Sequence, residues 1–410
     1  MTRPPRILAI AGSDSSGGAG IQADIKTITM LGGYAMTAIT AVTAQDTTGV
    51  HGIEALSPAM VGAQIDACTG DIGVDAVKIG MLGSADIAHL VADRLEALDV
   101  PVVFDPVMVA TSGAALADDA TIAAFERLMA LATLTTPNVP ELERLVGREI
   151  NGDEDSLAKA SEYLMKQTGA RAVLAKGGHW PGGEIRDARG LRRSTDNVIF
   201  DCLFARSGEG YWSEWTFDHP RIETRHNHGT GCTLSSAVAT FLGMGSDLPG
   251  AVSKAGDFVN LALRDAPGFG AGHGPLGHAA VRLDLTGEPR LNQITVPALD
   301  YAASVAFYRK LGLVQIVDSP ANGYARFESP GGATLSVHCG ETGGGAAVYF
   351  ECLDLDAMLE RLAAKGIEFT EPVHQSWLWL EAWAEDPAGN RICLYQAGIA
   401  RRYPPWALDR

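Results

Sequence analysis

Over the first 270 residues, short continuous apolar runs alternate with longer amphipathic segments, and this alternation restricts the fold more than any other feature of the sequence. A run that is apolar throughout is typical of a parallel strand buried on both faces. Amphipathic segments between such runs are typical of helices that cover a sheet, so the pattern predicts an α/β sandwich with a mostly parallel central sheet. The predicted strands are 6–11, 35–42, 76–79, 101–104, 134–136 and 172–175, and the predicted helices are 19–31, 57–72, 85–98, 119–131, 140–147 and 156–169.

The pattern changes twice farther along the chain. Residues 198–223 alternate and are rich in aromatic side chains, which predicts an antiparallel hairpin. After a stretch rich in Gly, Pro and His at 268–277, two amphipathic segments, 300–312 and 354–366, each begin with an Asp and end in Gly. Apolar strands precede both segments and β-rich sequence follows them, which predicts two βαβββ modules in tandem. We therefore expect one domain over residues 1–280, a linker over 281–290 and a second domain over 291–400.

Composition excludes several classes of function. The chain has 410 residues, a formal net charge of −17 and a pI of about 5.0. This balance disfavours binding to nucleic acid or to a membrane surface, because both reward Lys and Arg. None of the six cysteines forms a C-x-x-C pair, so we expect reduced thiols in a cytoplasmic protein. The first apolar run is too short for a signal peptide, and no segment has the length of a membrane span.

A glycine-rich turn, His228-Gly229-Thr230-Gly231-Cys232, precedes a predicted helix that begins near Thr233. The free backbone N–H groups of a helix start, together with the helix dipole, attract an anion. The helix start is also expected to lower the pKa of Cys232 and to favour its thiolate. A plain tight turn before a helix is the alternative explanation.

The segment Thr136-Pro137-Asn138-Val139-Pro140-Glu141 lies just past a predicted strand, where ligands gather in open α/β sheets. Asn138 and Glu141 are three residues apart at a helix start, so their oxygens can face one magnesium site. Capping of the helix by Asn138 is the simpler explanation.

Two more polar residues follow predicted strands. Lys176 precedes two glycines and can approach a polyphosphate, or it is a surface residue before a turn. Asp105 closes an apolar strand, or it serves only as a turn residue before proline. The glycine-rich loop 12–20 follows the first strand, but no G-x-x-x-x-G-K-[ST] motif is present, so the chain is not a P-loop enzyme.

Seven stretches, taken in their order and spacing, resemble the hydroxymethylpyrimidine/phosphomethylpyrimidine kinases of the ribokinase-like superfamily across roughly residues 5–278. They are AGSDSSGGAGIQADIKT, VTAQDTTGVHGI, KIGML, DPVM, TPNVPE, KGGH and HGTGCTLSSA. The resemblance implies a ribokinase-like αβα sandwich that phosphorylates 4-amino-5-hydroxymethyl-2-methylpyrimidine and its monophosphate for thiamine biosynthesis. ATP and Mg²⁺ would be its cofactors, small molecules its binding partners, and a homodimer its assembly.

The resemblance also implies roles for individual residues. Cys232 would be the base that takes the proton from the substrate hydroxyl, and the amides of Gly229, Thr230, Gly231 and Cys232 would form an anion hole for the transferred phosphoryl group. The pyrimidine would be bound at Gly12, Asp24, Gln45 and Met81. Mg-ATP would be bound at Asp105, Asn138, Glu141 and Lys176, and Glu141 would contact the Mg²⁺ indirectly.

Two points keep the substrate open. Pyridoxal also offers a hydroxymethyl group on a nitrogen ring, so a pyridoxal kinase on the same fold is the alternative. Where the family usually reads Asn-Thr-His before the anion hole, this chain reads His226-Asn227-His228, and the preceding hairpin carries Trp212 and Trp215. We interpret both departures as variation in a lid.

Residues 291–397 resemble the glyoxalase/bleomycin-resistance (vicinal oxygen chelate) superfamily through AASVAFYRKLGL, DLDAMLERLAAKGIEF and EDPAGNRICLYQ. Metal-binding members carry His, Glu or Gln at four strand positions, which match Gln293, Ser336, Ala347 and Cys393 here. Even with His338 on the same strand face as Ser336, this set is poor for a divalent metal, so we expect a metal-free domain.

Trp377, Trp379 and Trp383 are the remaining conspicuous residues of the second domain. Trp377 and Trp379 are expected to share one strand face, where core packing is the simplest explanation. An aromatic wall for a flat ligand such as a pyrimidine or thiazole is the alternative. A separate hypothesis makes the C-terminal half a module that sequesters an antibiotic or metabolite.

Overall fold

The computed structural model describes residues 3–109, 113, 115–150, 154–179, 184–186, 192–194, 197–206, 212–281, 290–310, 313–328, 332–339, 347–364, 366–385 and 391–407. The chain divides into two compact units, Met1–Val281 and Arg282–Arg410. No helix in the described part is long and apolar enough to cross a membrane.

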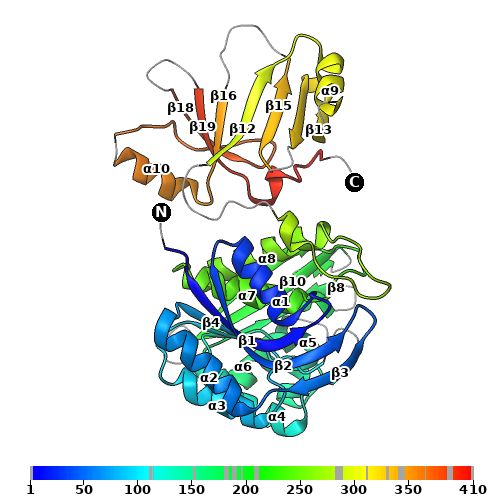
Figure 1. The fold of residues 1–410 in the computed structure, drawn as a ribbon. Coiled ribbons are helices and arrows are strands. Elements are labelled where there is room, and N and C mark those ends of the chain that lie inside the picture. The colour runs from blue at the N-terminus through cyan, green and yellow to red at the C-terminus, as the bar shows by residue number, and fades with distance from the viewer. Residues whose placement is uncertain are drawn as a thin grey trace. The chain divides into compact units, whose positions relative to one another are not determined.

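The first unit is built on a nine-stranded sheet in the order β11-β10-β7-β6-β5-β4-β1-β2-β3 (Figure 1). The strands from β7 to β2 in this order are parallel, and antiparallel strands flank them at both edges. The predicted mostly parallel sheet and the predicted hairpin are thus confirmed. The strands are β1 (Arg6–Asp14), β2 (Tyr34–Gln45), β3 (Val50–Ala55), β4 (Ala76–Ile79), β5 (Val102–Phe104), β6 (Leu134–Thr135), β7 (Ala172–Ala175), β10 (Val198–Arg206) and β11 (Trp212–Pro220), with β8 (Glu184–Arg186) and β9 (Arg192–Ser194) in a separate ribbon.

Helices cover both faces of this sheet, as the alternation predicts. Helices α2, α3, α4 and α6 pack side by side on one face, and α1, α7 and α8 pack on the other (Figure 1). The predicted helix 57–72 is shorter than expected, because α2 ends at Ala67 and a wider π-helical turn continues to Ile72. The helices are α1 (Gly20–Met30), α2 (Pro58–Ala67), α3 (Ala85–Leu95), α4 (Asp119–Leu131), α5 (Val139–Val146), α6 (Glu154–Thr168), α7 (Thr230–Gly243) and α8 (Leu248–Arg264).

The parallel strands bring polar residues to one edge of the sheet, because their carboxyl ends all point the same way. Asp14 ends β1, and Asp105, Thr136 and Lys176 follow directly or closely after β5, β6 and β7. Helix α7 begins at the same edge, and the residue before it, Gly229, has a φ of 89°. A side chain at Gly229 would place its Cβ 1.9 Å from the Gly18 carbonyl oxygen, so at this point the loop after β1 and the start of α7 approach each other backbone to backbone.

The second unit contains the two predicted βαβββ modules in one eight-stranded sheet, ordered β13-β14-β15-β12-β16-β19-β18-β17. Residues on one face pack on the two helices, Phe327 and Val337 against α9 and Leu394 and Ala382 against α10. The elements are β12 (Arg290–Pro297), α9 (Tyr301–Lys310), β13 (Val314–Ser319), β14 (Tyr324–Glu328) and β15 (Thr334–His338), then β16 (Ala347–Glu351), α10 (Leu355–Ala363), β17 (Val373–His374), β18 (Leu380–Glu385) and β19 (Arg391–Gln396).

Gly229→Ala tests how much the close approach at the start of α7 matters, and Gly245→Ala is its matched control. Both glycines have a φ of 89°, but nothing lies within 4 Å of a Cβ added at Gly245. We expect Gly245→Ala to lower the free energy of unfolding by about 1–2 kcal/mol through backbone strain alone. Gly229→Ala should cost more and should separate the two backbone segments. Equal losses in urea unfolding would show that the contact with Gly18 carries no energy.

Candidate active site

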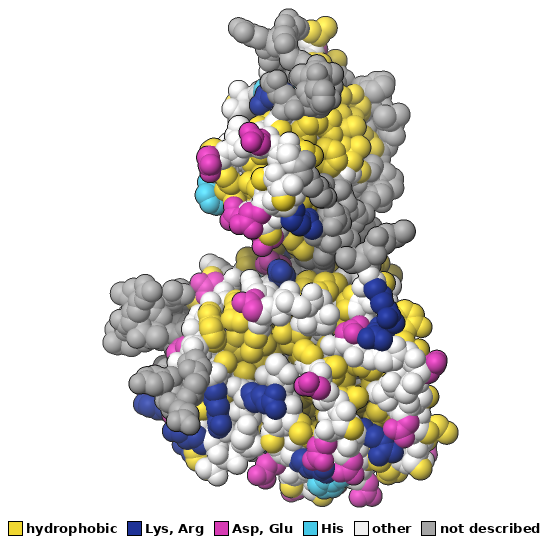
Figure 2. Space-filling view, turned by 90° about the vertical axis from the view of Figure 1, so that its left-hand side faces the viewer, with side chains coloured by type: hydrophobic (Ala, Val, Ile, Leu, Met, Phe, Trp, Pro, Cys, Tyr) yellow, Lys and Arg dark blue, Asp and Glu magenta, His cyan; other side chains and the backbone are white. Residues whose placement is uncertain are grey.

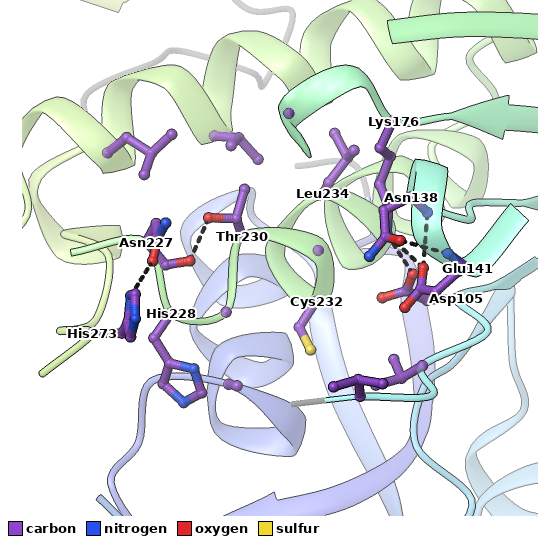
Figure 3. Close-up of a pocket in the computed structure, with 18 of the residues that line it drawn as sticks. Asp105, Asn138, Glu141, Lys176, Asn227, His228, Thr230, Cys232, Leu234 and His273 are labelled. Carbon is purple, nitrogen blue, oxygen red and sulfur yellow. Dashed lines mark hydrogen bonds and ion pairs between the residues drawn. The ribbon is translucent and has the colours of Figure 1, made fainter. Parts of the chain in front are cut away.

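A cavity of about 770 Å³ opens at the carboxyl edge of the first unit's parallel strands. Its lining comes from the loops after β1, β4, β5 and β7, from α5 and from the start of α7 (Figure 3). The structure brings together eleven of the twelve residues that the sequence singled out for this site. They are Gly12, Gln45, Met81, Asp105, Asn138, Glu141, Lys176, Gly229, Thr230, Gly231 and Cys232.

A buried charged cluster of Asp105, Glu141 and Lys176 forms one wall of the cavity (Figure 3). Lys176 Nζ lies 2.8 Å from Asp105 Oδ1 and 4.0 Å from Glu141 Oε2, and the Thr136 hydroxyl donates to the same Asp105 oxygen. Although burial lowers it, the two carboxylates hold the pKa of Lys176 above its ordinary value. Burial raises the pKa of Glu141 to about 7, and Lys176 only partly opposes this effect. Two carboxylates with one ammonium leave the cluster one positive charge short when both acids are ionised.

The spacing of Asn138 and Glu141 has a structural role as well. Asn138 Oδ1 accepts from the Glu141 backbone N–H at 2.9 Å, and Glu141 Oε2 accepts from the Asn138 backbone N–H at 2.8 Å. This reciprocal pair is a capping box at the start of α5, so the simpler capping explanation is confirmed. Both side chains also line the cavity, and capping fixes their orientation toward Lys176.

The start of α7 lies directly beside the charged cluster in the wall of the cavity. A Cβ added at Gly231 would lie 3.3 Å from Lys176 Nζ and 3.4 Å from Asp105 Oδ2. Because the first N–H groups of a helix have no intrahelical partners, the amides of Gly231 and Cys232 present donors here. An anion at this point would meet both the helix dipole and the Lys176 ammonium.

The predicted thiolate of Cys232 is contradicted by its surroundings. Burial raises the pKa of the Cys232 thiol to about 11, and Lys78 opposes this effect while Asp24 and Asp105 add to it. The helix start and a hydrogen bond from the Gly20 backbone do not overcome the loss of water around the sulfur. The unliganded thiol is therefore protonated at neutral pH.

Asp24 does not line the cavity, so its predicted contact with a pyrimidine is wrong for this structure. Its fully buried carboxylate accepts from Lys78 Nζ at 2.8 and 2.9 Å and from the Ser236 hydroxyl at 2.7 Å. Ser236 lies one helical turn after Cys232 on α7, so the Lys78–Asp24 ion pair sits behind the thiol. A lysine in the apolar run 76–79 is the sequence signal that could have revealed this pair, since a buried ammonium requires a carboxylate.

Sequence reasoning also missed Asp14 and His228, which join the loop after β1 to the turn before α7. His228 Nε2 lies 2.8 Å from Asp14 Oδ2, and Asp14 also accepts from the backbone N–H groups of Ser16 and Ala19. Although burial raises it, these bonds hold the pKa of Asp14 below its ordinary value. Nε2 of His228 therefore carries the proton that it donates to Asp14. It cannot also accept from Gln45, 3.2 Å away, whose amide N–H groups remain available to a ligand.

Of the residues that depart from the family pattern, Asn227 lines the cavity, whereas His226, Trp212 and Trp215 do not. The Asn227 carbonyl accepts from the Thr230 hydroxyl at 2.7 Å, and Asn227 Oδ1 lies 3.0 Å from His273 Nδ1 (Figure 3). Trp212 and Trp215 belong to β11, the edge strand of the sheet, whereas the segment just after that strand lines the cavity.

The four metal positions of the second unit do not fit a metal. Ala347 has no ligand atom, the Ser336 hydroxyl is bound to Tyr324 at 2.9 Å, and burial raises the pKa of Cys393 far above its ordinary value. The guanidinium of Arg326 lies beside Gln293 and would repel a cation. No group of three or more His, Cys, Asp or Glu that could hold a metal occurs among the residues that the structure describes.

Comparisons with known proteins separate the same two parts of the chain. The Phosphomethylpyrimidine kinase family matches residues 14–277, and the Glyoxalase/Bleomycin resistance protein/Dioxygenase superfamily matches residues 290–394. The chain is 46% identical over 275 residues to the hydroxymethylpyrimidine/phosphomethylpyrimidine kinase of Rhizobium meliloti, covering 66% of this chain and 96% of that protein.

Two further relatives extend the comparison. The thiamine biosynthesis bifunctional protein ThiED of Geobacter sulfurreducens is 45% identical over 282 residues, which is 68% of this chain and 53% of that protein, so the chain spans about half of it. The ADP complex of Bacillus subtilis pyridoxal kinase has a TM-score of 0.58 and 32% identity, covering 68% of this chain and 98% of that one. The first unit therefore has the fold of these kinases, as expected.

Glu141→Gln tests whether the cluster of Asp105, Glu141 and Lys176 has one carboxylate more than Lys176 can neutralise. Because the folded-state pKa of about 7 exceeds the ordinary 4.5, folding takes up a proton between these values. The free energy of unfolding therefore falls as pH rises through this window. Glutamine keeps the capping oxygen and removes the charge, so we expect a gain of about 1–3 kcal/mol at pH 8 and little change at pH 4.

Urea unfolding read by pulse proteolysis at both pH values measures this gain, with the exposed Glu126→Gln as control. If the free energy of unfolding of the variant had the same pH dependence as that of the parent, burial would not raise the pKa of Glu141.

Lys78→Met tests the ion pair behind Cys232. Lys78 is the strongest of the groups that lower the thiol pKa, so we expect alkylation of Cys232 at fixed pH to slow by about tenfold for each unit by which the pKa rises. Asp24→Asn removes the opposing charge and should speed alkylation. Mass spectrometry of the tryptic peptide 226–254, whose sole cysteine is Cys232, gives the rate. Lys166→Met, at an exposed position on α6 outside this peptide, is the control. Unchanged alkylation rates in both variants would show that the Lys78–Asp24 ion pair has no effect on the pKa of the Cys232 thiol.

Proposed function

We propose, because the chain belongs to the phosphomethylpyrimidine kinase family, that it transfers the γ-phosphoryl group of ATP to 4-amino-5-hydroxymethyl-2-methylpyrimidine. Its second step would phosphorylate the resulting monophosphate and yield the diphosphate for thiamine biosynthesis. The observation that carries this proposal is the start of α7 directly beside Lys176 and the charged cluster, in one cavity that Cys232 also lines (Figure 3).

The donor end of the cavity suits a nucleoside triphosphate. Lys176 can contact phosphate oxygens, and the amides of Gly231 and Cys232 can hold the phosphoryl group as its charge is redistributed. The cluster of Asp105, Glu141 and Lys176 lacks one positive charge, and it offers the oxygen ligands that Mg²⁺ prefers. When bound there, Mg²⁺ would neutralise phosphate charge, with Glu141 and Asp105 on its protein side.

The acceptor end of the cavity suits a polar aromatic ring. Gly12 lies against Met81, where a Cβ would approach the Met81 sulfur to 3.2 Å, so the backbone can come close to a flat ligand. Gln45 offers amide groups to ring nitrogens and to an amino substituent, which would be costly to bury unpaired. Asp14 and His228 hold the loop after β1 against the turn before α7, and this contact sets the distance between the two ends.

In the proposed reaction Cys232 accepts the hydroxyl proton, and only its thiolate can do so. With a pKa of about 11, the thiolate fraction rises about tenfold per pH unit between pH 7 and 10. We therefore expect kcat at saturating substrate to rise with pH across this range and Cys232→Ala to be slower by 10²-fold or more with a flat profile. Cys202→Ala, a buried cysteine outside the cavity, is the control.

ATP consumption with Mg²⁺, offered the pyrimidine, its monophosphate and pyridoxal side by side, provides the measurement. Turnover of both pyrimidines supports the proposal, whereas turnover of pyridoxal alone supports the second candidate function, which the likeness to a pyridoxal kinase favours. A flat parent pH profile with an impaired Cys232→Ala would leave Cys232 a positioning residue. Absence of turnover with every acceptor would refute the proposal.

We also propose the domain boundaries 1–280, 281–290 and 291–400, a cytoplasmic location, where ATP is made, and a homodimer. Support for the dimer comes from exposed apolar side chains on neighbouring elements, Ile25 on α1, Val42 on β2 and Ile53 on β3.

The face of the first unit seen in Figure 2 carries Lys, Arg, Asp and Glu side chains intermixed rather than one large basic patch. Sedimentation velocity of the full chain tests the dimer, and a monomer at all concentrations would exclude it.

A further inference from the structure

The sheet of the second unit has an inner face, which we define as the face opposite α9 and α10. Strand register places Arg326 opposite Ser336, Ser336 opposite Thr295 and Thr295 opposite Ala347, so these residues share that face. Their sequence neighbours Ala325, Phe327 and Val337 pack in the core under α9 instead. All four matched metal positions therefore belong to the inner face or its continuation on β19, where Cys393 pairs with Tyr349.

Three charged residues on this face, Arg326, Arg401 and Glu351, form what we call the arginine cluster. Only 2%, 5% and 4% of their surfaces are exposed. Arg401 Nη1 lies 3.5 Å from Glu351 Oε2 and donates to Asn292 Oδ1 at 2.7 Å, and Asn292 also donates to Glu351. Two guanidinium groups with one carboxylate leave the cluster one negative charge short.

Arg326 is the member without a carboxylate within ion-pair distance in the described part of the second unit. Its contacts are neutral: Gln293 Oε1 at 3.5 Å, the backbone carbonyl of Arg401 and the ring of Trp379 at 4.9 Å. Its Nε has no hydrogen-bond partner among the residues described. Burial lowers its pKa, as expected for a cation held away from water without a counter-ion.

The Trp379 ring beside this guanidinium belongs to a group of packed aromatic side chains. Trp379 and Tyr395 stack with centroids 4.2 Å apart and planes 12° apart, and Tyr349 meets both rings edge-on. The fully buried Tyr395 hydroxyl has no hydrogen-bond partner within the described structure. Trp377 precedes β18 in a turn, so the expected common strand face with Trp379 is wrong. Of the three tryptophans, Trp379 is the one whose ring lies against Arg326, while Trp377 and Trp383 pack at the edge of the aromatic group. The group combines a cation, a hydroxyl and flat apolar surfaces.

A segment of the chain covers the group. The short helical turn Gly398–Arg401 places the Ala400 carbonyl 3.2 Å from Trp379 Nε1 and the Arg401 carbonyl on Arg326. A neutral carbonyl oxygen, that of Arg401, thus occupies the position that an anionic oxygen would take beside the guanidinium. A carbonyl compensates a buried positive charge less well than a carboxylate or phosphate does.

We propose that the second unit binds a small organic anion, a carboxylate or a phosphate monoester on a flat ring, whose charged oxygens pair with Arg326 in place of the Arg401 carbonyl. The ring would lie against Trp379 and Tyr395, and the segment 398–407 would move aside as the anion enters. No metal takes part. The proposal is independent of the kinase activity, because every group it uses belongs to residues 290–407.

The test uses the full chain with benzoate, phenyl phosphate and neutral benzamide as probes. We expect either anion, or both, to raise the thermal midpoint of the second unit by about 5 °C near saturation, and benzamide to leave it unchanged. Hydrogen exchange of backbone amides in 398–407 should speed up with the anion, because this segment loses its contacts. A shift with phenyl phosphate alone assigns a phosphate monoester, and a shift with benzoate alone assigns a carboxylate.

Arg326→Met should abolish the anion-dependent shift without lowering the midpoint in the absence of probe, because it removes an uncompensated buried charge. Arg391→Met is the matched control, since Arg391 lies over the Trp383 ring at 4.2 Å on an exposed part of the same sheet, and it should keep the shift. If Arg326→Met fails to fold, Arg326→Gln replaces it. The proposal is overturned if neither anion acts at up to about 10 mM, a concentration that detects millimolar dissociation constants. It is also overturned if the Arg326 variants keep the shift or exchange in 398–407 stays unchanged.

Discussion

The start of α7 is the constraint on which the rest of the kinase unit depends. A helix start with free N–H groups must face an anion or water, and here it faces a cavity beside Lys176. The chain reaches this arrangement only because Gly229 and Gly18 lack side chains at their contact. The parallel sheet provides the polar residues of the site, since Asp14, Asp105 and Lys176 lie at the carboxyl ends of its strands, at the same edge. Moving α7 by the width of one methyl group would separate the anion hole from these groups.

Charge balance in buried places explains the differences between the clusters of this chain. Lys78 and Asp24 neutralise each other and do not line the cavity. We interpret this ion pair as a fixed part of the environment that affects the pKa of Cys232. Asp105, Glu141 and Lys176 carry an excess negative charge when Glu141 is ionised, which suits a site for a metal-bound polyphosphate. The arginine cluster of the second unit retains an excess positive charge. In each case an incomplete set of buried charges indicates the sign of what the site would bind.

Sequence patterns predicted regular elements best where burial was complete. The strands at 76–79 and 172–175 and the helix at 119–131 match β4, β7 and α4, because their side chains face a core on one or both sides. Strand β3 was not predicted, since it is an exposed edge strand containing His, Gly and Glu and has no apolar run. The protonated state of Cys232 and the ion pair of Asp24 were also missed, because both depend on residues more than 50 positions away in sequence.

The sequence by itself determined the layered α/β architecture, the two βαβββ modules and eleven of the residues that line the cavity, because periodicity and short motifs are local properties of the chain. Only the tertiary structure decided which polar groups meet. It joined Asp14 to His228 across 214 positions and enclosed Lys78 with Asp24, and it set Arg326 among neutral partners. These outcomes depend on distance and on the exclusion of water. Both are set by how the elements pack, and a pattern within one segment carries no information about them.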